Sequence, residues 1–240
     1  MRPLPARTDA TTTWRFRSGS AAADDWPNAV AALRCSLSFV SCYIYAPRGE
    51  GLISVESRRL CQRIKASDPQ WLPRYAGQVA ELCCRQPLFA DLFARHAWLV
   101  PVPGCFPTCS RSTAASQLAM ALGALGLAHE VWPGITRSAA VTRSATARVG
   151  ERPTVRQHYE SFTITAAPRP PPRIVLIDDV ITKGRTLLAA AAKLHDAFPH
   201  ADVRAFAMVR SLGFSTRIDR LLAPCVGVVY WARGDARREP

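Results

Sequence analysis

The feature that most constrains this chain is the run RIVLIDDVITKGRT, from Arg173 to Thr186. Its first residues, RIVLI, are apolar and β-branched and predict a short buried strand over Arg173–Ile177. Two adjacent acids, Asp178 and Asp179, follow, and a helix is expected from Thr186 to about Phe198. A strand, a polar loop and a helix in this order predict an α/β unit with a ligand site at the carboxyl end of the strand.

The acids and the loop after them suit a ligand that carries both hydroxyl groups and phosphate. Inside a strand Asp178 and Asp179 would point to opposite faces, but at a strand end both can reach one cavity, where carboxylates suit vicinal hydroxyls. The loop offers backbone N–H groups, hydroxyls and cations at a helix N-terminus, which together form an anion cradle. Its residues are Thr182, Lys183, Gly184, Arg185 and Thr186. The alternative is that the acids only cap the helix and that Gly184 is an ordinary turn glycine.

The rest of the chain alternates between strand and helix patterns, which favours an α/β fold with a mainly parallel central sheet flanked by helices. Strands are expected over 37–46, 97–102, 130–135, 159–165, 203–209 and 226–231, with 52–55 as a hairpin partner of the first. Helices are expected over 57–66, 71–84 and 112–127. We expect a disordered arm (1–28), a small N-terminal hood (29–96) and an α/β domain (97–240).

The charge of the chain indicates polyanionic partners. The formal net charge is +13, from 31 basic and 18 acidic residues, and only three of the basic residues are lysines. Arginine has the planar fork that matches phosphate, and a coding bias toward arginine would not explain the excess of basic over acidic residues. The segment 136–156 concentrates this charge and predicts a long basic loop.

The N-terminal segment and the cysteines indicate a cellular compartment. The N-terminus lacks the apolar core of a secretory signal, so the eight cysteines are expected to be reduced thiols in a cytoplasm. Its Arg, Ser and Thr residues also fit a mitochondrial-type transit peptide, which is the alternative to a disordered tail. The longest apolar stretch, 118–128, is too short to cross a bilayer, so no membrane partner is expected.

The run from Arg173 to Thr186 resembles the phosphoribosyl pyrophosphate (PRPP) binding motif of type I phosphoribosyltransferases. That motif has a hydrophobic strand, two acids and a Thr- and Gly-rich loop. The resemblance implies that Asp178 and Asp179 hold the ribose hydroxyls and that the loop from Thr182 to Thr186 binds the 5′-phosphate. Lys183 departs from the pattern, because Thr or Ser is commoner there, although a cation also suits phosphate.

Other segments look like the competence protein F (ComF-like) branch of that family, so that the resemblance covers roughly residues 40–212. Pro103 and Gly104, in a PVPG run, and Arg111 resemble the pyrophosphate loop, and the basic segment from Arg137 to Arg156 resembles the mobile lid. The YESF run at 159–162, the YIY run at 43–45 and the RIK run at 63–65 are similar to the same branch. Members often carry a zinc ribbon, but this chain has no C-x-x-C, so no zinc is expected.

The resemblance implies a phosphoribosyltransferase that uses PRPP with Mg²⁺ and releases pyrophosphate. Arg111 and lid arginines such as Arg143 would neutralise the leaving group. Thr182 stands where enzymes acting on 6-oxopurines carry an acid, so a hypoxanthine- or guanine-type enzyme is not expected. The acceptor is left open, as is the oligomeric state, with a homodimer among the alternatives.

Two other classes of function compete with the transferase. The fold could serve as a PRPP or nucleotide sensor, or as an accessory protein for DNA uptake or repair that binds nucleic acid through its basic surface. A hydrolase or kinase-like enzyme is disfavoured because the chain lacks a G-x-x-x-x-G-K-[ST] loop. Among the histidines, His158 is expected to be a solvated loop residue, and it is also the only one with substrate contact as an alternative.

Overall fold

The computed structural model describes residues 36–107, 113–142, 151–165, 167, 172–213, 215 and 217–240. Within them the chain forms, in order, β1 (Leu37–Tyr45), α1 (Leu52–Lys65), α2 (Leu72–Arg85), α3 (Pro87–Leu92), β2 (Ala97–Pro101), α4 (Ala114–Ala124), β3 (Glu130–Val131), β4 (Ile135–Arg137), α5 (Val155–Ser161), β5 (Phe162–Ile164), β6 (Arg173–Ile181), α6 (Arg185–Ala197), β7 (Asp202–Ser211), β8 (Leu222–Ala232) and β9 (Asp235–Glu239). The arm expected over 1–28 lies outside the described residues.

A mixed sheet of seven strands organises the described part of the chain, in the order β3-β2-β6-β7-β1-β8-β9. Neighbouring strands from β3 to β1 run parallel, whereas β8 and β9 are antiparallel to their neighbours. Strands β4 and β5 form a separate antiparallel pair. The expected α/β fold is therefore confirmed as a mostly parallel mixed sheet with helices.

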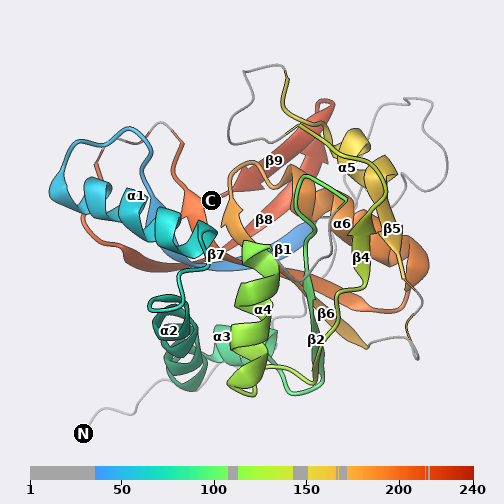
Figure 1. Cartoon of the computed structure of the whole chain (residues 1–240), viewed down its shortest axis with the longest axis horizontal. Coiled ribbons are helices and arrows are strands. Elements are labelled where there is room, and N and C mark those ends of the chain that lie inside the picture. Colours follow the sequence, from blue (N-terminus) through green and yellow to red (C-terminus); the bar gives the residue numbers. More distant parts are fainter. Residues whose placement is uncertain are drawn as a thin grey trace, which may run out of the picture.

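Helices cover both faces of the sheet (Figure 1). One hydrophobic cluster joins Ile174 and Leu176 of β6 to residues of α5 and α6. The other joins Val175 and Ile177 to residues of α1, α2, α3 and α4. Because successive side chains of a strand point to opposite faces, β6 is apolar on both sides, as in other central strands of parallel sheets.

The N-terminal region differs from expectation in two respects. The hairpin strand expected over 52–55 is wrong, because these residues begin α1, which buries Ser57, Leu60 and Ile64 at helical spacing. A short apolar run such as LISV is compatible with the spacing of a strand or of a helix, and in the structure it is helical. Strand β1 lies between β7 and β8, so the sheet takes strands from both sides of the boundary expected at residue 96.

Two expected strands between β2 and β6 are shorter than the sequence predicts. The strand expected over 130–135 ends at Val131, after which the Trp132 ring packs against Gly134. The strand expected over 159–165 begins only at Phe162, because the residues before it form α5.

A capping box between Thr154 and Gln157 stabilises the first turn of α5 and so favours helix over strand there. The basic loop expected over 136–156 is correspondingly shorter at both ends. Arg137 belongs to β4, and α5 begins at Val155.

The C-terminal hairpin adds a strand that was not expected. The chain turns at Arg233 and Gly234, both at positive φ, and β9 then pairs with β8. The other expected strands and helices are present, with ends shifted by a few residues. In the described part of the chain, no helix is both long enough and apolar enough to cross a membrane.

Candidate functional site

The two adjacent acids lie near the carboxyl end of β6, inside the strand and not after it. Asp178 pairs with Ala207 of β7, and the ladder between the two strands continues to Ile181. Asp178 and Asp179 are both partly exposed, and a carboxylate oxygen of Asp178 accepts a hydrogen bond of 2.9 Å from the backbone N–H of Asp179. Although both acids lie within the strand, their carboxyl groups are close enough for a side-chain contact between them. The pair lies near the edge where parallel α/β sheets bind ligands.

The environment of Asp178 disfavours its ionised form. Burial and the nearby charge of Asp179 raise the pKa of Asp178, while the ammonium group of Lys65 lowers it. Burial also raises the pKa of Cys61 to about 11. The charge of Lys65 lowers this pKa, and the charge of Asp179 raises it. Because Cys61 and Lys65 belong to the last turns of α1, that end of the helix lies close to the acids.

The donor set at the acids suits a hard cation or a diol. Carboxylate oxygens are the ligands that Mg²⁺ prefers, usually together with phosphate oxygens of a substrate and with water. Among the residues that the structure describes, no group of three or more His, Cys, Asp or Glu side chains is placed to hold a metal ion. Two carboxyl groups alone would leave most positions around such a cation to oxygen atoms of water or of a bound ligand.

The turn before α6 has the geometry of an anion site. Gly184 adopts φ +80° and precedes the helix, and it provides no side-chain cap for the first backbone N–H groups. A Cβ atom at Gly184 would lie 2.6 Å from a methyl carbon of Val229, so the turn also needs glycine for close packing. The uncapped N–H groups and the helix dipole together favour an anion at this position.

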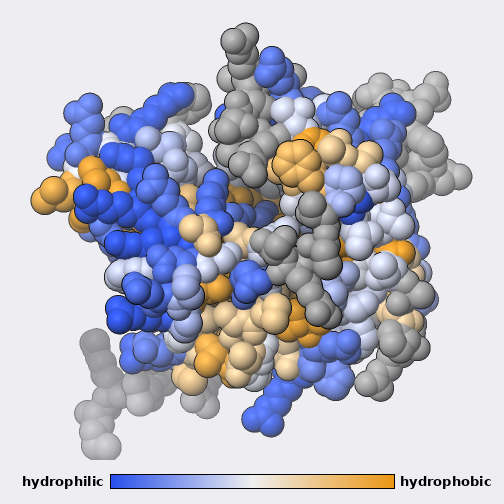
Figure 2. Space-filling view, in the orientation of Figure 1, coloured by the Kyte–Doolittle hydropathy of each residue, from blue (hydrophilic) through white to orange (hydrophobic). Residues whose placement is uncertain are grey.

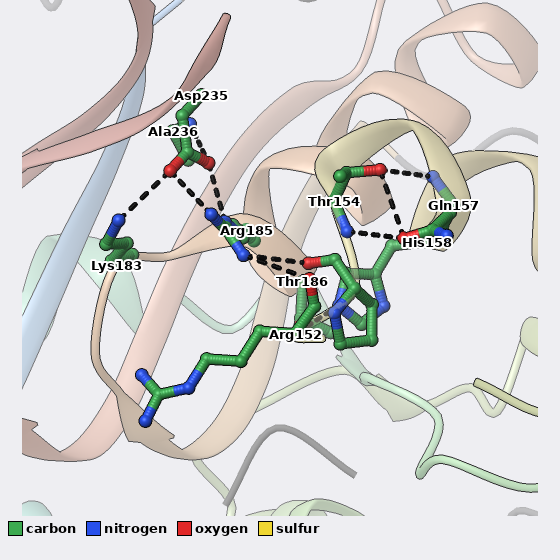
Figure 3. A network of polar contacts seen from close by, with 10 residues as sticks. Arg152, Thr154, Gln157, His158, Lys183, Arg185, Thr186, Asp235 and Ala236 are labelled. Carbon is green, nitrogen blue, oxygen red and sulfur yellow. Dashed lines mark hydrogen bonds and ion pairs between the residues drawn. The ribbon is translucent and has the colours of Figure 1, made fainter. Parts of the chain in front are cut away.

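The two cations of this loop are paired with an acid that the sequence did not reveal. Lys183 Nζ lies 3.1 Å from one oxygen of Asp235, and Arg185 donates from two nitrogen atoms to both oxygens at 2.6 Å (Figure 3). Burial alone would raise the pKa of Asp235, but hydrogen bonds from Arg185 and Lys183 lower it to about 2. The cations therefore fasten β9 to the loop.

Arg185 also connects the loop to the residues before α5. Its guanidinium donates to the carbonyl oxygens of Arg152 and Pro153 at 3.3 and 3.1 Å. Figure 3 shows Arg185 between Asp235 on one side and Arg152 on the other. The side chain of Arg185 thus connects β9 on one side to the residues before α5 on the other.

A chain of polar contacts joins Thr186 to the loop after β2. The hydroxyl of Thr186 lies 3.5 Å from His158 Nε2, and His158 Nδ1 lies 3.3 Å from a guanidinium nitrogen of Arg137. Arg137 Nε donates to the carbonyl oxygen of Gly104 at 2.7 Å, and another nitrogen donates to the hydroxyl of Ser161. These contacts link the expected phosphate loop to the expected pyrophosphate loop.

The two titratable residues in this series of contacts, Arg137 and His158, are buried. Arg137 is 6% exposed and His158 is 4% exposed. Burial lowers the pKa of Arg137 to about 10, and burial, followed by the charges of Arg137 and Arg185, lowers the pKa of His158 to about 4. At neutral pH the guanidinium is charged and the imidazole is neutral. The expectation that His158 is a solvated loop residue is wrong, because the residue is buried within α5.

The structure gathers most of the expected site residues at one end of the sheet. The N–H of Val102 donates to the carbonyl of Ile177, which places Pro103 and Gly104 next to the end of β6. The acids and the residues from Thr182 to Thr186 lie at the same edge. Arg111 and Arg143, expected to neutralise a leaving group, lie outside the described residues.

Comparison with known proteins does not assign a family. No protein-family model matches the chain, and no curated protein matches it significantly.

Proposed function

We propose that this protein is a phosphoribosyltransferase of the type I kind, which binds PRPP with Mg²⁺ and transfers the phosphoribosyl group to an acceptor. The observation that carries this proposal is the succession, within a few residues, of a half-buried acid pair at the end of β6, a left-handed turn at Gly184 and the uncapped N-terminus of α6. Vicinal hydroxyls and a phosphate group satisfy these two features at once.

Each part of the ligand has a partner in this arrangement. Asp178 and Asp179 accept hydrogen bonds from the ribose hydroxyls. The backbone N–H groups at the start of α6 and the Thr182 and Thr186 hydroxyls donate to the 5′-phosphate. Because Asp235 occupies the side chains of Lys183 and Arg185, the phosphate is held mainly by backbone N–H groups and hydroxyls. The loop at Pro103 and Gly104 faces the diphosphate.

Transfer breaks the bond between C1′ and the diphosphate oxygen, which keeps the electron pair, while the acceptor forms a new bond to C1′. Asp178 and Asp179 would hold Mg²⁺ together with ligand oxygens, and the ion would neutralise charge on the diphosphate. The carboxylates also stabilise positive charge that develops on the ribose ring.

The contacts of α1 bear on the competing interpretation, nucleic-acid binding through the basic surface. Hydrophilic side chains gather over α1 in Figure 2, and this helix carries four basic residues. Arg59 and Arg63 pair with Glu56, however, and Arg58 donates to the backbone carbonyls of Ala46 and Gly49. Three of these four cations therefore already have partners within the chain.

Calorimetric titration of PRPP with and without Mg²⁺ tests the proposal. Wild-type protein and a control, Glu81→Gln on an exposed position of α2, should bind with micromolar affinity. The double variant Asp178→Asn/Asp179→Asn, checked for folding by circular dichroism, should lose binding. Absence of PRPP binding by folded wild-type protein would overturn the proposal.

A screen of nitrogenous bases for pyrophosphate release then separates a transferase from a sensor. Release that depends on an added acceptor identifies a transferase, whereas binding with no release under any acceptor favours a sensor. Salt-sensitive DNA binding that persists in the double variant would instead indicate a nucleic-acid-binding protein.

A further inference from the structure

Arg137 is a buried arginine for which the described part of the chain supplies no acidic partner. Arg137 is 6% exposed, and its hydrogen-bond partners among the described residues are the carbonyl of Gly104, the hydroxyl of Ser161 and the ring of His158. The guanidinium also lies over the ring of Phe162, 4.5 Å from its centroid. All of these partners are neutral, so a positive charge remains uncompensated inside the protein.

An uncompensated buried charge is costly for a fold, and an anion bound nearby reduces that cost. Arg137 reaches both loops to which we assign anionic groups, directly at Gly104 and through His158 at Thr186. The position of the charge thus fits a ligand with two anionic groups better than a ligand with one.

The contact with Gly104 fixes the direction of a backbone donor. In a trans peptide the C=O of one residue and the N–H of the next point in opposite directions. The described part of the chain contains no cis peptide bond, and the Gly104 carbonyl points at Arg137. The N–H of Cys105 therefore points away from the guanidinium.

The contact with His158 fixes the direction of a side-chain donor. A guanidinium has only donors, so Nδ1 of the neutral ring must accept from Arg137 and Nε2 must carry the proton. The contact from Nε2 to Thr186 Oγ1, at 3.5 Å, then runs from the ring to the hydroxyl oxygen. The proton of the Thr186 hydroxyl is thereby left for another acceptor.

We propose that Arg137 is a positioning residue that orients one donor in each anion-binding loop. Through Gly104 it directs the Cys105 N–H toward a diphosphate, and through His158 it directs the Thr186 hydroxyl toward a 5′-phosphate. This inference rests on the proposed function and names the device that holds the two loops in a fixed relation. The contacts of Arg137 thus form two branches, one through Gly104 to the diphosphate and one through His158 to the 5′-phosphate. His158 belongs only to the second branch.

Binding of three probes distinguishes the branches: PRPP, inorganic pyrophosphate and ribose 5-phosphate. Loss of a hydrogen bond to a charged group weakens binding by about 10- to 100-fold, so Arg137→Gln should weaken all three probes by about this factor. His158→Gln should weaken ribose 5-phosphate about tenfold and leave pyrophosphate within about twofold of wild type. A merely structural role would not produce this selectivity.

The control is Arg204→Gln, which removes a guanidinium of similar burial from the start of β7, at the opposite end of the sheet. It should leave all three affinities within about twofold of wild type. Pyrophosphate and ribose 5-phosphate weakened equally by His158→Gln, or PRPP affinity unchanged in Arg137→Gln, would overturn the inference. Failure of wild-type protein to bind any probe would instead overturn the proposed function.

A measurement on the unliganded wild-type protein tests the inference even if the variants do not fold. Nitrogen-15 NMR of the wild-type histidine rings should show His158 as the Nε2–H tautomer at pH 7. The Nδ1–H tautomer would reverse the direction of the contacts and overturn the inference. Arg137→Lys, which keeps the charge but cannot reach three partners at once, should give affinities between those of wild type and Arg137→Gln.

Discussion

Arg185 and Asp235 are 50 residues apart in the chain, yet two guanidinium nitrogens of Arg185 lie 2.6 Å from the two carboxylate oxygens of Asp235. Such a two-pronged pair fixes orientation as well as distance. It brings β9 against the loop that begins α6. A single carboxylate supplied by the chain itself therefore pairs with both cations beside the proposed phosphate site and offsets part of their charge.

Asp235→Asn should destabilise the protein by about 2 kcal/mol at pH 7, because Arg185 and Lys183 lose their charged acceptor. The pKa of Asp235 is about 2 in the folded state and about 4 in an unfolded chain. The stabilisation is therefore present above about pH 4 and is lost as the pH falls toward 2. Urea unfolding at several pH values should show the two proteins converging in acid. A constant difference down to pH 2 would contradict the assignment.

Gly184→Ala should destabilise the protein and weaken PRPP binding. The new methyl group adds strain at φ +80° and meets Val229 at 2.6 Å, for a total cost of about 2–4 kcal/mol. Thermal unfolding and calorimetry measure the two effects.

Gly126→Ala is the matched control for this substitution. Gly126 has φ +73° and open space around its Cβ position, so only the backbone strain of about 1 kcal/mol should appear. Adding Val229→Ala to Gly184→Ala should restore part of the PRPP affinity by making room for the methyl group. Equal losses of stability at the two glycines would show that the contact with Val229 is unimportant.

The sequence predicts the acid pair and the glycine turn because their residues are consecutive. Asp178, Asp179 and Gly184 are placed by one strand and one helix, and local patterns suffice to predict both. The end of β6 could not be read locally, because hydrogen bonds to β7 extend it to Ile181. Pairing between strands depends on a partner sequence that no local pattern contains.

The contacts of Arg137 and Asp235 are absent from any local pattern for the same reason. Arg137 stands in a basic segment and is therefore expected in a lid, but its burial depends on Gly104 and Phe162, in other segments. Asp235 follows a turn that the sequence analysis did not resolve. An acid in a basic C-terminal segment gives no signal that it contacts a loop 50 residues away.

Because of His158, the protein should lose stability as the pH is lowered from about 6.5 to about 4. Its pKa is about 4 when folded and about 6.5 when unfolded, so in this window only the unfolded chain takes up the proton. The loss of stability should reach about 3 kcal/mol at the acid end. His158→Gln should lack this slope, and the difference between the two unfolding curves isolates the contribution of His158. Parallel curves would show that folding does not lower the pKa of His158.

Asp178→Asn should stabilise the unliganded protein at alkaline pH while it abolishes PRPP binding. Burial and Asp179 raise the pKa of the Asp178 carboxyl, so ionisation costs folding free energy as the pH rises above the unfolded value of about 4. Asparagine imitates the neutral form, so the variant should be more stable than wild type at pH 8, and the difference should vanish near pH 4. Denaturant titrations at the two pH values test this. A variant less stable at both would show that the carboxylate has a structural role.

The position of β1 has a consequence for how the chain can be assembled. This strand is synthesised before both of its partners in the sheet, which are residues 205–211 on one side and 222–229 on the other. Until both have emerged from the ribosome, a nearly fully buried apolar strand has two unpaired edges, each of which can pair with another chain. Covering the edges of β1 until its two partners have been made would therefore limit pairing with other chains.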